Sequence, residues 1–312
     1  MALLISVLEQ GMIYGILALG VYITYKILDF PDLTVDGSFP FGAAVTVRLI
    51  SDFQVPAILT LPIAFVGGAL VGMCTGLIHV KLRVRDLLSG IIMMTGLYTI
   101  NLWVAGTGYV AIFDKENIFN NNLINSIVPG FLMSFKNVII IFVITMLAKY
   151  LLDWYMSTKS GFLLRAVGDN STIVTSLGVD KGLVKIIGLS IANGLVALSG
   201  CIYAQQQRSF EISIGTGAVV IGLASVIIGS SLFQKMTVFR VTGSVIIGSI
   251  LYKACVALAM FAGIDANAIK LITAVLFLVI LVISRDRKRA GRSIGRGRKG
   301  PVAGLEREEG VK

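Results

Sequence analysis

The residues in this sequence that could do chemistry are few, and they lie far apart. Inside otherwise apolar stretches, four polar or charged positions are notable, Glu9, Asn101, Asn193 and Lys253. Catalysis would need such groups in facing pairs, for example two acids or a nucleophile with its base. Each of the four instead stands in a different apolar stretch. Because polar groups inside a membrane usually face a bundle interior or an aqueous route, this pattern favours transport over catalysis.

Asn101, Asn193 and Lys253 are therefore candidate residues of a translocation path. A hydrogen-bonded contact between two helices explains such residues equally well, so both interpretations stay open. Glu9 is a weaker candidate, because few residues of its stretch precede it and it can lie at the membrane interface.

Metal and nucleotide sites are not predicted for this chain. His79 is the only histidine, and no cluster of cysteines or carboxylates has the spacing of a zinc site. Cys74, Cys201 and Cys255 all lie in apolar runs, which implies no disulfide framework. No G-x-x-x-x-G-K-[ST] segment is present to hold a nucleotide. We predict that the chain binds no cofactor and is not an enzyme.

The composition requires a membrane protein. Of the 312 residues, 56% are apolar and 14% are charged, with a mean hydropathy of +0.88, which leaves too little polar surface for a water-soluble globule. A membrane-spanning helix needs roughly 20 mostly apolar residues. Eight stretches meet this need: Leu3–Ile23, Val55–Val80, Leu87–Val110, Phe131–Leu152, Val184–Tyr203, Ala218–Phe233, Phe239–Phe261 and Ala268–Ile283.

A ninth apolar stretch, Ser38–Ile50, is too short for a comfortable crossing and contains Arg48. It is predicted as a broken or re-entrant helix buried in protein. The stretches lack the period-two alternation of a transmembrane barrel. The predicted fold is thus all-α, a polytopic transmembrane helical bundle. Gly68, Gly72 and Gly76 recur every fourth residue and predict a helix face that another backbone can approach closely.

Lysine and arginine positions indicate the orientation, because cytoplasmic loops retain positive charge. Assigning alternate loops to one side puts four of these residues together, Lys115, Lys136, Arg208 and Lys270. Ten fall on the other side, which is predicted to be cytoplasmic: Lys81, Arg83, Arg85, Lys149, Lys159, Arg165, Lys181, Lys185, Lys235 and Arg240. Residues 1–284 are predicted to form the membrane domain.

The tail, residues 285–312, is predicted to be cytoplasmic and disordered. It holds ten Lys or Arg and four Asp or Glu residues. A nucleic-acid-binding arm would have such a charge, but an anchor near anionic lipid is the better interpretation, so we predict no nucleic-acid partner.

The connection of about residues 157–181 is longer than two membrane spans need. Asp169 or Asn170 can cap a short helix there. Ile173, Val174 and Leu177 would lie on one face of that helix, and Gly178 would end it. A helix of this kind can receive motion from an attached motor protein or can lie on the membrane surface. The pattern alone does not decide between the two.

Three segments resemble a known family. The run from Gly161 to Val179 resembles the cytoplasmic coupling loop of the permeases of bacterial ABC importers, in the branched-chain amino acid and ribose permease superfamily, which reads G-x-x-L-R-A-V-G-D-N before L-G-[IV]. Asp32 to Ala44 and Gly217 to Gly229 are similar to further segments of a subgroup associated with amino-acid uptake, including aromatic amino acids. One departure is Ser171 to Thr175, where many relatives have Pro-Glu-Ala-Ala-Arg.

The resemblance implies a permease subunit of a bacterial cytoplasmic membrane, with its C-terminus in the cytoplasm. Its implied partners are a second permease copy, an ATP-binding subunit that holds ATP and Mg, and an extracytoplasmic solute-binding protein. The residues implied to form the ATPase-coupling loop are Gly161, Phe162, Leu164, Arg165, Asp169, Asn170, Ile173, Leu177 and Gly178. The alternatives are a secondary transporter without an ATPase and, less favoured, a polytopic membrane enzyme.

Overall fold

The computed structural model describes residues 2–121, 135–176, 178–233, 241–261, 271, 273–275, 277–279 and 282. The described chain is predominantly helical. Its elements are α1 (Ala2–Val21), the π-helical turn η1 (Tyr22–Ile27), α2 (Val35–Ser51), η2 (Ala57–Leu59), α3 (Thr60–Lys81), α4 (Asp86–Ala105), β1 (Tyr109–Ala111), α6 (Lys136–Met156), α7 (Lys159–Asp169), α8 (Ser171–Ser176), α9 (Lys181–Gln207), β2 (Ser209–Glu211), η4 (Ile212–Gly215), α10 (Ala218–Leu232) and α11 (Val241–Phe261).

The described residues contain seven helices that are long and apolar enough to cross a membrane. They coincide with seven of the eight predicted spans, so the all-α transmembrane bundle is confirmed. The eighth predicted span, 268–283, lies largely outside the described residues, as does the tail 285–312. One predicted end is wrong: the helix predicted over 87–110 stops at Ala105, because Gly106 takes a left-handed conformation with φ of 82°.

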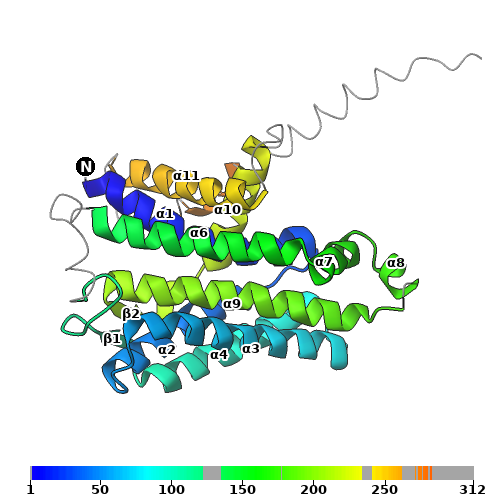
Figure 1. Ribbon diagram of the computed structural model, residues 1–312, viewed down its shortest axis with the longest axis horizontal. Helices are drawn as coiled ribbons and strands as arrows, with labels where there is room; N and C mark the ends of the chain where they lie inside the picture. The colour runs from blue at the N-terminus through cyan, green and yellow to red at the C-terminus, as the bar shows by residue number, and fades with distance from the viewer. Residues whose placement is uncertain are drawn as a thin grey trace, which may run out of the picture.

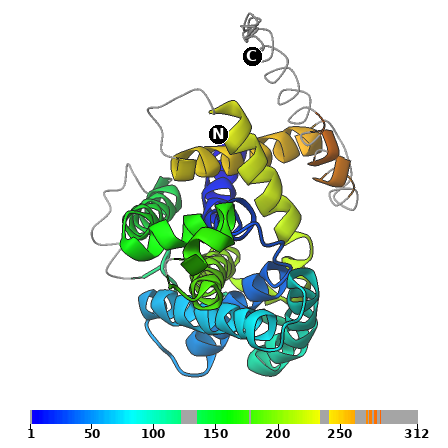
Figure 2. The same ribbon diagram turned by 90° about the vertical axis from the view of Figure 1, so that its right-hand side faces the viewer.

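The helices form a bundle around α9 (Figure 1). Helices α1, α6, α10 and α11 lie on one side of α9, and α2, α3 and α4 lie on the other (Figures 1 and 2). The short helices α7 and α8 lie at one end of the bundle, and the antiparallel pair β1–β2 lies at the other. Helix α9 packs against α1, α2 and α3, and it contributes many of the fully buried residues of the core.

Glycines set the close approach of α3 to α9. A Cβ atom on Gly68 would lie 2.5 Å from the carbonyl oxygen of Asn193, and a Cβ on Gly72 would overlap the carbonyl oxygen of Leu189. Gly76 lies against Ile186 in the same row. The predicted glycine face is confirmed, and a larger side chain at these positions would push the two helices apart.

Helix α2 is the short, buried helix that the sequence predicts over 38–50, although it begins three residues earlier, at Val35. Its start lies inside the bundle, where Thr34 and Val35 are fully buried. Pro40 in this helix has no N–H to donate to the carbonyl group of Asp36. Gly215 packs against that carbonyl group so closely that a Cβ atom there would overlap its oxygen.

Candidate functional site

The connection between α6 and α9 folds into two short helices rather than one. Thr158 caps α7 by accepting a hydrogen bond from Gly161 N at 3.3 Å. Asn170 then leaves the helical conformation, and its Oδ1 accepts from Thr172 N at 3.0 Å to start α8. Gly178 follows with a left-handed φ of 74°. The predicted cap at Asn170 and the stop at Gly178 are confirmed, whereas α7 itself is not predicted by the sequence analysis.

The inner face of α7 packs firmly on the membrane helices. Gly161, Leu164 and Val167 are buried. A Cβ atom on Gly188 of α9 would lie 2.5 Å from Leu164 Cδ1, and a Cβ on Gly168 would overlap the carbonyl oxygen of Ile27 in η1. Helix α7 is therefore closely packed on α9 and on η1, without room for a larger side chain at either contact.

The outer face of α7 and α8 is exposed at the end of the molecule. Phe162 is 60% exposed, and Arg165, Asp169, Asn170 and Gly178 are exposed as well. The predicted coupling residues are thus divided, because Gly161 and Leu164 pack inside this chain. The side chain of Ile173 and all of Leu177 lie outside the described residues.

Two of the three predicted path residues hold the start of α2. Asn193 is fully buried, donates from Nδ2 to Asp32 Oδ2 at 2.8 Å and accepts at Oδ1 from Ser38 Oγ at 2.7 Å. From α4, Asn101 Nδ2 donates to Gly37 O at 3.1 Å. The two amides, one on α9 and one on α4, therefore hold the first turn of α2 in place. These contacts correspond to the interhelical hydrogen bonds that the sequence leaves open as an alternative.

Two acids that the sequence analysis assigns no role complete this region. Asp32 Oδ1 accepts from Thr34 N at 2.9 Å in the turn before α2. Asp36 reaches the start of α10, where its carboxylate accepts from Gly217 N at 3.1 Å and Val219 N at 2.8 Å. A carboxylate at this place satisfies free N–H groups and interacts favourably with the positive end of the helix. The available signal was the spacing of two acids, four residues apart, between apolar stretches.

Lys253 lies elsewhere, between α11 and α1. Its Nζ is 3.7 Å from the centroid of the Tyr14 ring and 3.5 Å from Gln10 Oε1. The residue is largely covered but not fully buried. The structure thus brings Asn101 and Asn193 to one place and Lys253 to another.

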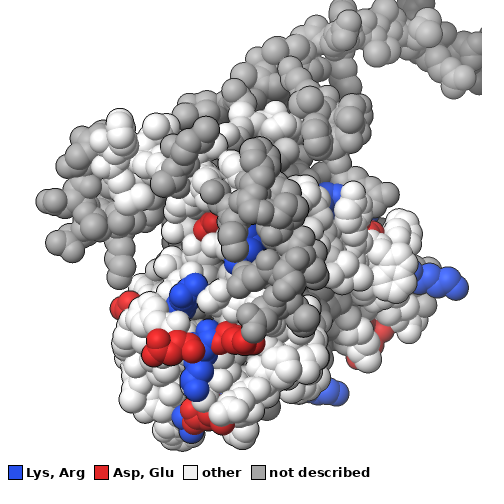
Figure 3. Space-filling view, turned by 60° about the vertical axis from the view of Figure 1, so that its left-hand side comes forward, with Lys and Arg blue, Asp and Glu red and all other residues white. Residues whose placement is uncertain are grey.

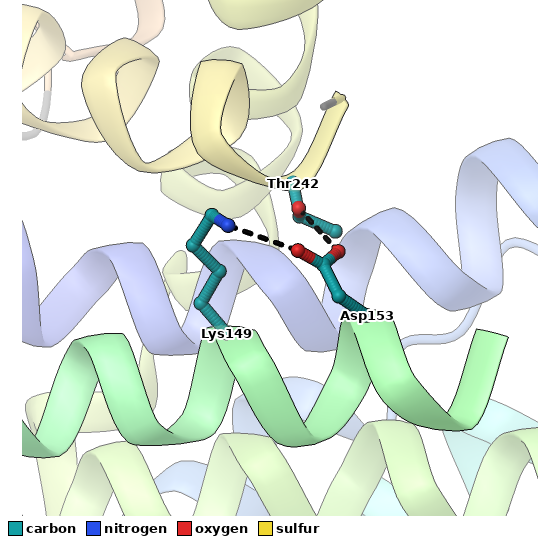
Figure 4. Close-up of polar contacts among 3 residues, drawn as sticks. All are labelled: Lys149, Asp153 and Thr242. Atoms are coloured by element: carbon teal, nitrogen blue, oxygen red, sulfur yellow. Dashed lines mark hydrogen bonds and ion pairs between the residues drawn. The ribbon is translucent and has the colours of Figure 1, made fainter. Parts of the chain in front are cut away.

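A third polar contact joins α6 to the start of α11 (Figure 4). One oxygen of Asp153 accepts from Lys149 Nζ at 2.9 Å, and the other accepts from Thr242 Oγ1 at 2.6 Å. Asp153 is buried and lies near the end of α6 that leads into α7. The contact therefore links the helix before α7 to the helix that carries Lys253.

We expect Asp153→Asn to lower the stability of the protein by about 1–3 kcal/mol, since the amide loses its charge-assisted bond with Lys149. The measurement is thermal unfolding in detergent. In the double variant Asp153→Asn/Lys149→Met, no buried ammonium is left without its acid, so part of the loss should be recovered. Equal melting temperatures of Asp153→Asn and the unchanged protein would show that the contact contributes nothing.

Charges at the two ends of the bundle differ. Around the β1–β2 end, acidic and basic side chains are intermixed, without a wide field of one sign (Figure 3). Arg48 and Asp52 form an ion pair at this end, at 2.5 Å. At the α7 end, Lys81 is the last residue of α3, and Arg83 and Arg85 lie in the loop that follows it. Lys159 and Lys181 are at the starts of α7 and α9.

Comparisons with known proteins agree with the membrane architecture. Residues 3–283 match the family described as branched-chain amino acid transport system / permease component. The tyrosine transport system permease protein of Clostridioides difficile strain R20291 is 39% identical over 278 residues, covering 89% of this chain and 90% of the relative.

Relatives of lower identity are named as permeases for other solutes. The ribose import permease protein RbsC of Escherichia coli K12 is 25% identical over 237 residues, which is 73% of this chain and 69% of the relative. The probable branched-chain amino acid transport permease protein LivH of Methanocaldococcus jannaschii is 26% identical over 223 residues, 69% of this chain and 70% of the relative. No solved structure gives a significant match. The chain is a multi-pass membrane protein that belongs to the permease components of the branched-chain amino acid transport family.

Proposed function

We propose that this permease imports an aromatic amino acid, with energy from a separate ATP-binding subunit. The observation that carries the proposal is the exposed outer face of α7 and α8, because α7 packs through Gly168 on η1 and through Leu164 on α9. A partner that moves this face moves the membrane helices with it. The 39% identical tyrosine permease supports the choice of substrate.

The proposed assembly has two copies of this chain, two ATP-binding subunits and an extracytoplasmic solute-binding protein in a bacterial cytoplasmic membrane. ATP and Mg belong to the ATP-binding subunits. The basic residues near α7, including Arg83, Arg85 and Lys159, support a cytoplasmic position for this end. That orientation puts the β1–β2 end toward the binding protein, and a cytoplasmic C-terminus is part of the same proposal.

In this mechanism the permease is a two-state element. Closure of the ATP-bound motor subunits favours one packing of the bundle, and hydrolysis returns it to the other, because the motor binds the two packings with different affinities. This chain hydrolyses nothing itself. Its part is to transmit the movement of α7 to the helices that surround the solute.

The test is ATP-dependent uptake of radiolabelled L-tyrosine into proteoliposomes that contain the permease, its ATP-binding subunit and its binding protein. We expect uptake only when all three components and ATP are present. Uptake of the same rate without the ATP-binding subunit would contradict the proposal and favour a secondary transporter.

We further expect Phe162→Glu to weaken binding of the ATP-binding subunit by about 2 kcal/mol, or roughly 30-fold, since an exposed aromatic residue at such an interface is a typical energetic centre. Phe53→Glu is the matched control, because Phe53 is 68% exposed near the opposite end of the bundle. Co-purification and a binding titration in detergent measure both. Equal affinity of the two variants would mean that the motor binds elsewhere.

A further inference from the structure

A polar and aromatic cluster between α1, α9 and α11 is not explained by the packing or by the coupling of α7. We call it the α1–α11 cluster and define it by Glu9, Gln10 and Tyr14 of α1, Tyr203 and Gln206 of α9, and Lys253 of α11. These residues lie toward the half of the bundle that is nearest β1–β2, because Gln206 is adjacent to the end of α9, directly before β2.

The cation of this cluster, Lys253, has no acid partner among the residues that the structure describes. The ion pairs found in the described part of the chain are Arg48 with Asp52 and Lys149 with Asp153. Among the described residues, the polar and aromatic contacts of Lys253 are the neutral amide oxygen of Gln10 and the Tyr14 ring. An ammonium group inside a membrane protein is costly unless an anion or an aromatic face compensates it. The Tyr14 ring supplies the aromatic face, and no acid of the described residues pairs with Lys253. The surroundings therefore suit a ligand that brings a carboxylate.

The opposite charge lies on α1, at Glu9, next to the Gln10 that contacts Lys253. Glu9 is buried, and its Oε2 accepts from Gln206 Nε2 at 3.0 Å. The oxygen of that amide, Gln206 Oε1, is buried and has no hydrogen-bond partner in the described structure. A carboxylate and a free amide oxygen are the acceptors that an α-ammonium group needs.

Aromatic rings lie beside these polar groups. The Tyr14 ring is stacked on Phe39 with centroids 5.6 Å apart and meets Tyr203 edge to face at 5.9 Å. Tyr203 is partly exposed, whereas Tyr14 and Phe39 are buried. From Glu9 to Tyr14 the axis of α1 rises about 7.5 Å, which is comparable to the length of one amino acid.

We propose that the α1–α11 cluster is a site on the translocation path that recognises the zwitterion of an aromatic amino acid. Lys253 with Gln10 receives the α-carboxylate, Glu9 with Gln206 Oε1 receives the α-ammonium group, and the Tyr14–Tyr203 rings face the side chain. This inference rests on the proposed function as an amino-acid importer.

The test is charge rescue at position 253 in the complete reconstituted importer. The parent carries Cys74→Ser and Cys255→Ser, because both of these cysteines are exposed. In this parent we expect Lys253→Cys to reduce L-tyrosine uptake about tenfold or more, as loss of a charge-assisted bond predicts. Treatment with aminoethyl methanethiosulfonate, which restores an ammonium group, should recover uptake. Methyl methanethiosulfonate, which adds a neutral group, should not recover uptake.

Protection adds a readout that a packing role would not change. L-Tyrosine should slow the reaction of Lys253→Cys with the reagent, while tyramine, which lacks the carboxylate, should not. Equal recovery with the neutral reagent, or wild-type uptake by unmodified Lys253→Cys, would overturn the site. Should Lys253→Cys fail to assemble, Lys253→Met and Lys253→Arg keep the length of the side chain, and the site then requires uptake by Lys253→Arg to exceed that by Lys253→Met.

Uptake by the parent protein, which carries Cys74→Ser and Cys255→Ser, distinguishes a wrong binding site from a wrong proposed function. If the parent does not take up L-tyrosine with ATP, the proposed function is contradicted. If the parent transports and position 253 tolerates removal of the charge, only the site is contradicted.

Discussion

Asn193→Asp is expected to prevent this permease from accumulating in folded form in the membrane. Asn193 Nδ2 is 2.8 Å from Asp32 Oδ2, and both residues are buried. The substitution replaces this donor with a second carboxylate and leaves two negative charges facing each other. Removing one partner of a buried charged contact costs about 3–5 kcal/mol, which is a large share of the stability of an average domain. The measurements are membrane yield and thermal unfolding in detergent.

The double variant Asp32→Asn/Asn193→Asp is the decisive control for this prediction. It exchanges donor and acceptor between α9 and the turn before α2, so one amide again faces one carboxylate. Position 193 still accepts from Ser38 Oγ, whereas its bond to Leu189 O is lost. We expect recovery of most of the yield, with a strongly favourable coupling energy in the double-mutant cycle. A double variant that is no better than Asn193→Asp would show that the contact has a minor role.

The membrane spans could be predicted from the sequence because their signal is local. A run of apolar residues of sufficient length needs no information about its neighbours. The start of α2 was less predictable, since the helix begins at Val35 inside the bundle, where Asp32 and Asn193 decide how the chain enters it. The contact joins residues that are 161 positions apart, and one sequence contains no signal for such a pairing.

Helix α7 was missed for a different reason. Its segment contains Gly161 and Gly168, which lower intrinsic helix propensity, and its apolar residues are too few for a membrane span. In the structure the same glycines permit the helix, because each lies against backbone where a side chain would overlap. Tertiary packing thus decides the conformation of this segment, and the exposed and buried members of the coupling motif become distinguishable only there.

The α1–α11 cluster shows the same limit. Lys253 and Glu9 are visible in the sequence as polar residues in apolar stretches, yet nothing places Tyr14 under the Lys253 ammonium group or Gln206 beside Glu9. The pairing follows from the contact of α1 with α9 and α11. Glycines allow part of this approach, because Gly11 and Gly15 of α1 lie against Ile250 and Ile246 of α11.

Gly168→Val tests whether α7 transmits movement to the membrane helices, and we expect it to uncouple ATP hydrolysis from uptake. The valine side chain has no space beside the carbonyl oxygen of Ile27, so α7 must move away from η1. Overpacking of this kind costs about 1–3 kcal/mol. If this cost destabilises the packing of the bundle that the ATP-bound motor favours, uptake decreases by about 5- to 150-fold.

The exposed face of α7 and α8 is unchanged in Gly168→Val, so the ATP-binding subunit should still co-purify and hydrolyse ATP. Gly96→Val is the matched control, because Gly96 is also in a helix and no atom lies within 4 Å of a Cβ placed there. Uptake per ATP hydrolysed in proteoliposomes measures the coupling. Uptake by Gly168→Val within twofold of Gly96→Val would mean that the motor acts on the membrane helices through a contact other than that of Gly168 with Ile27.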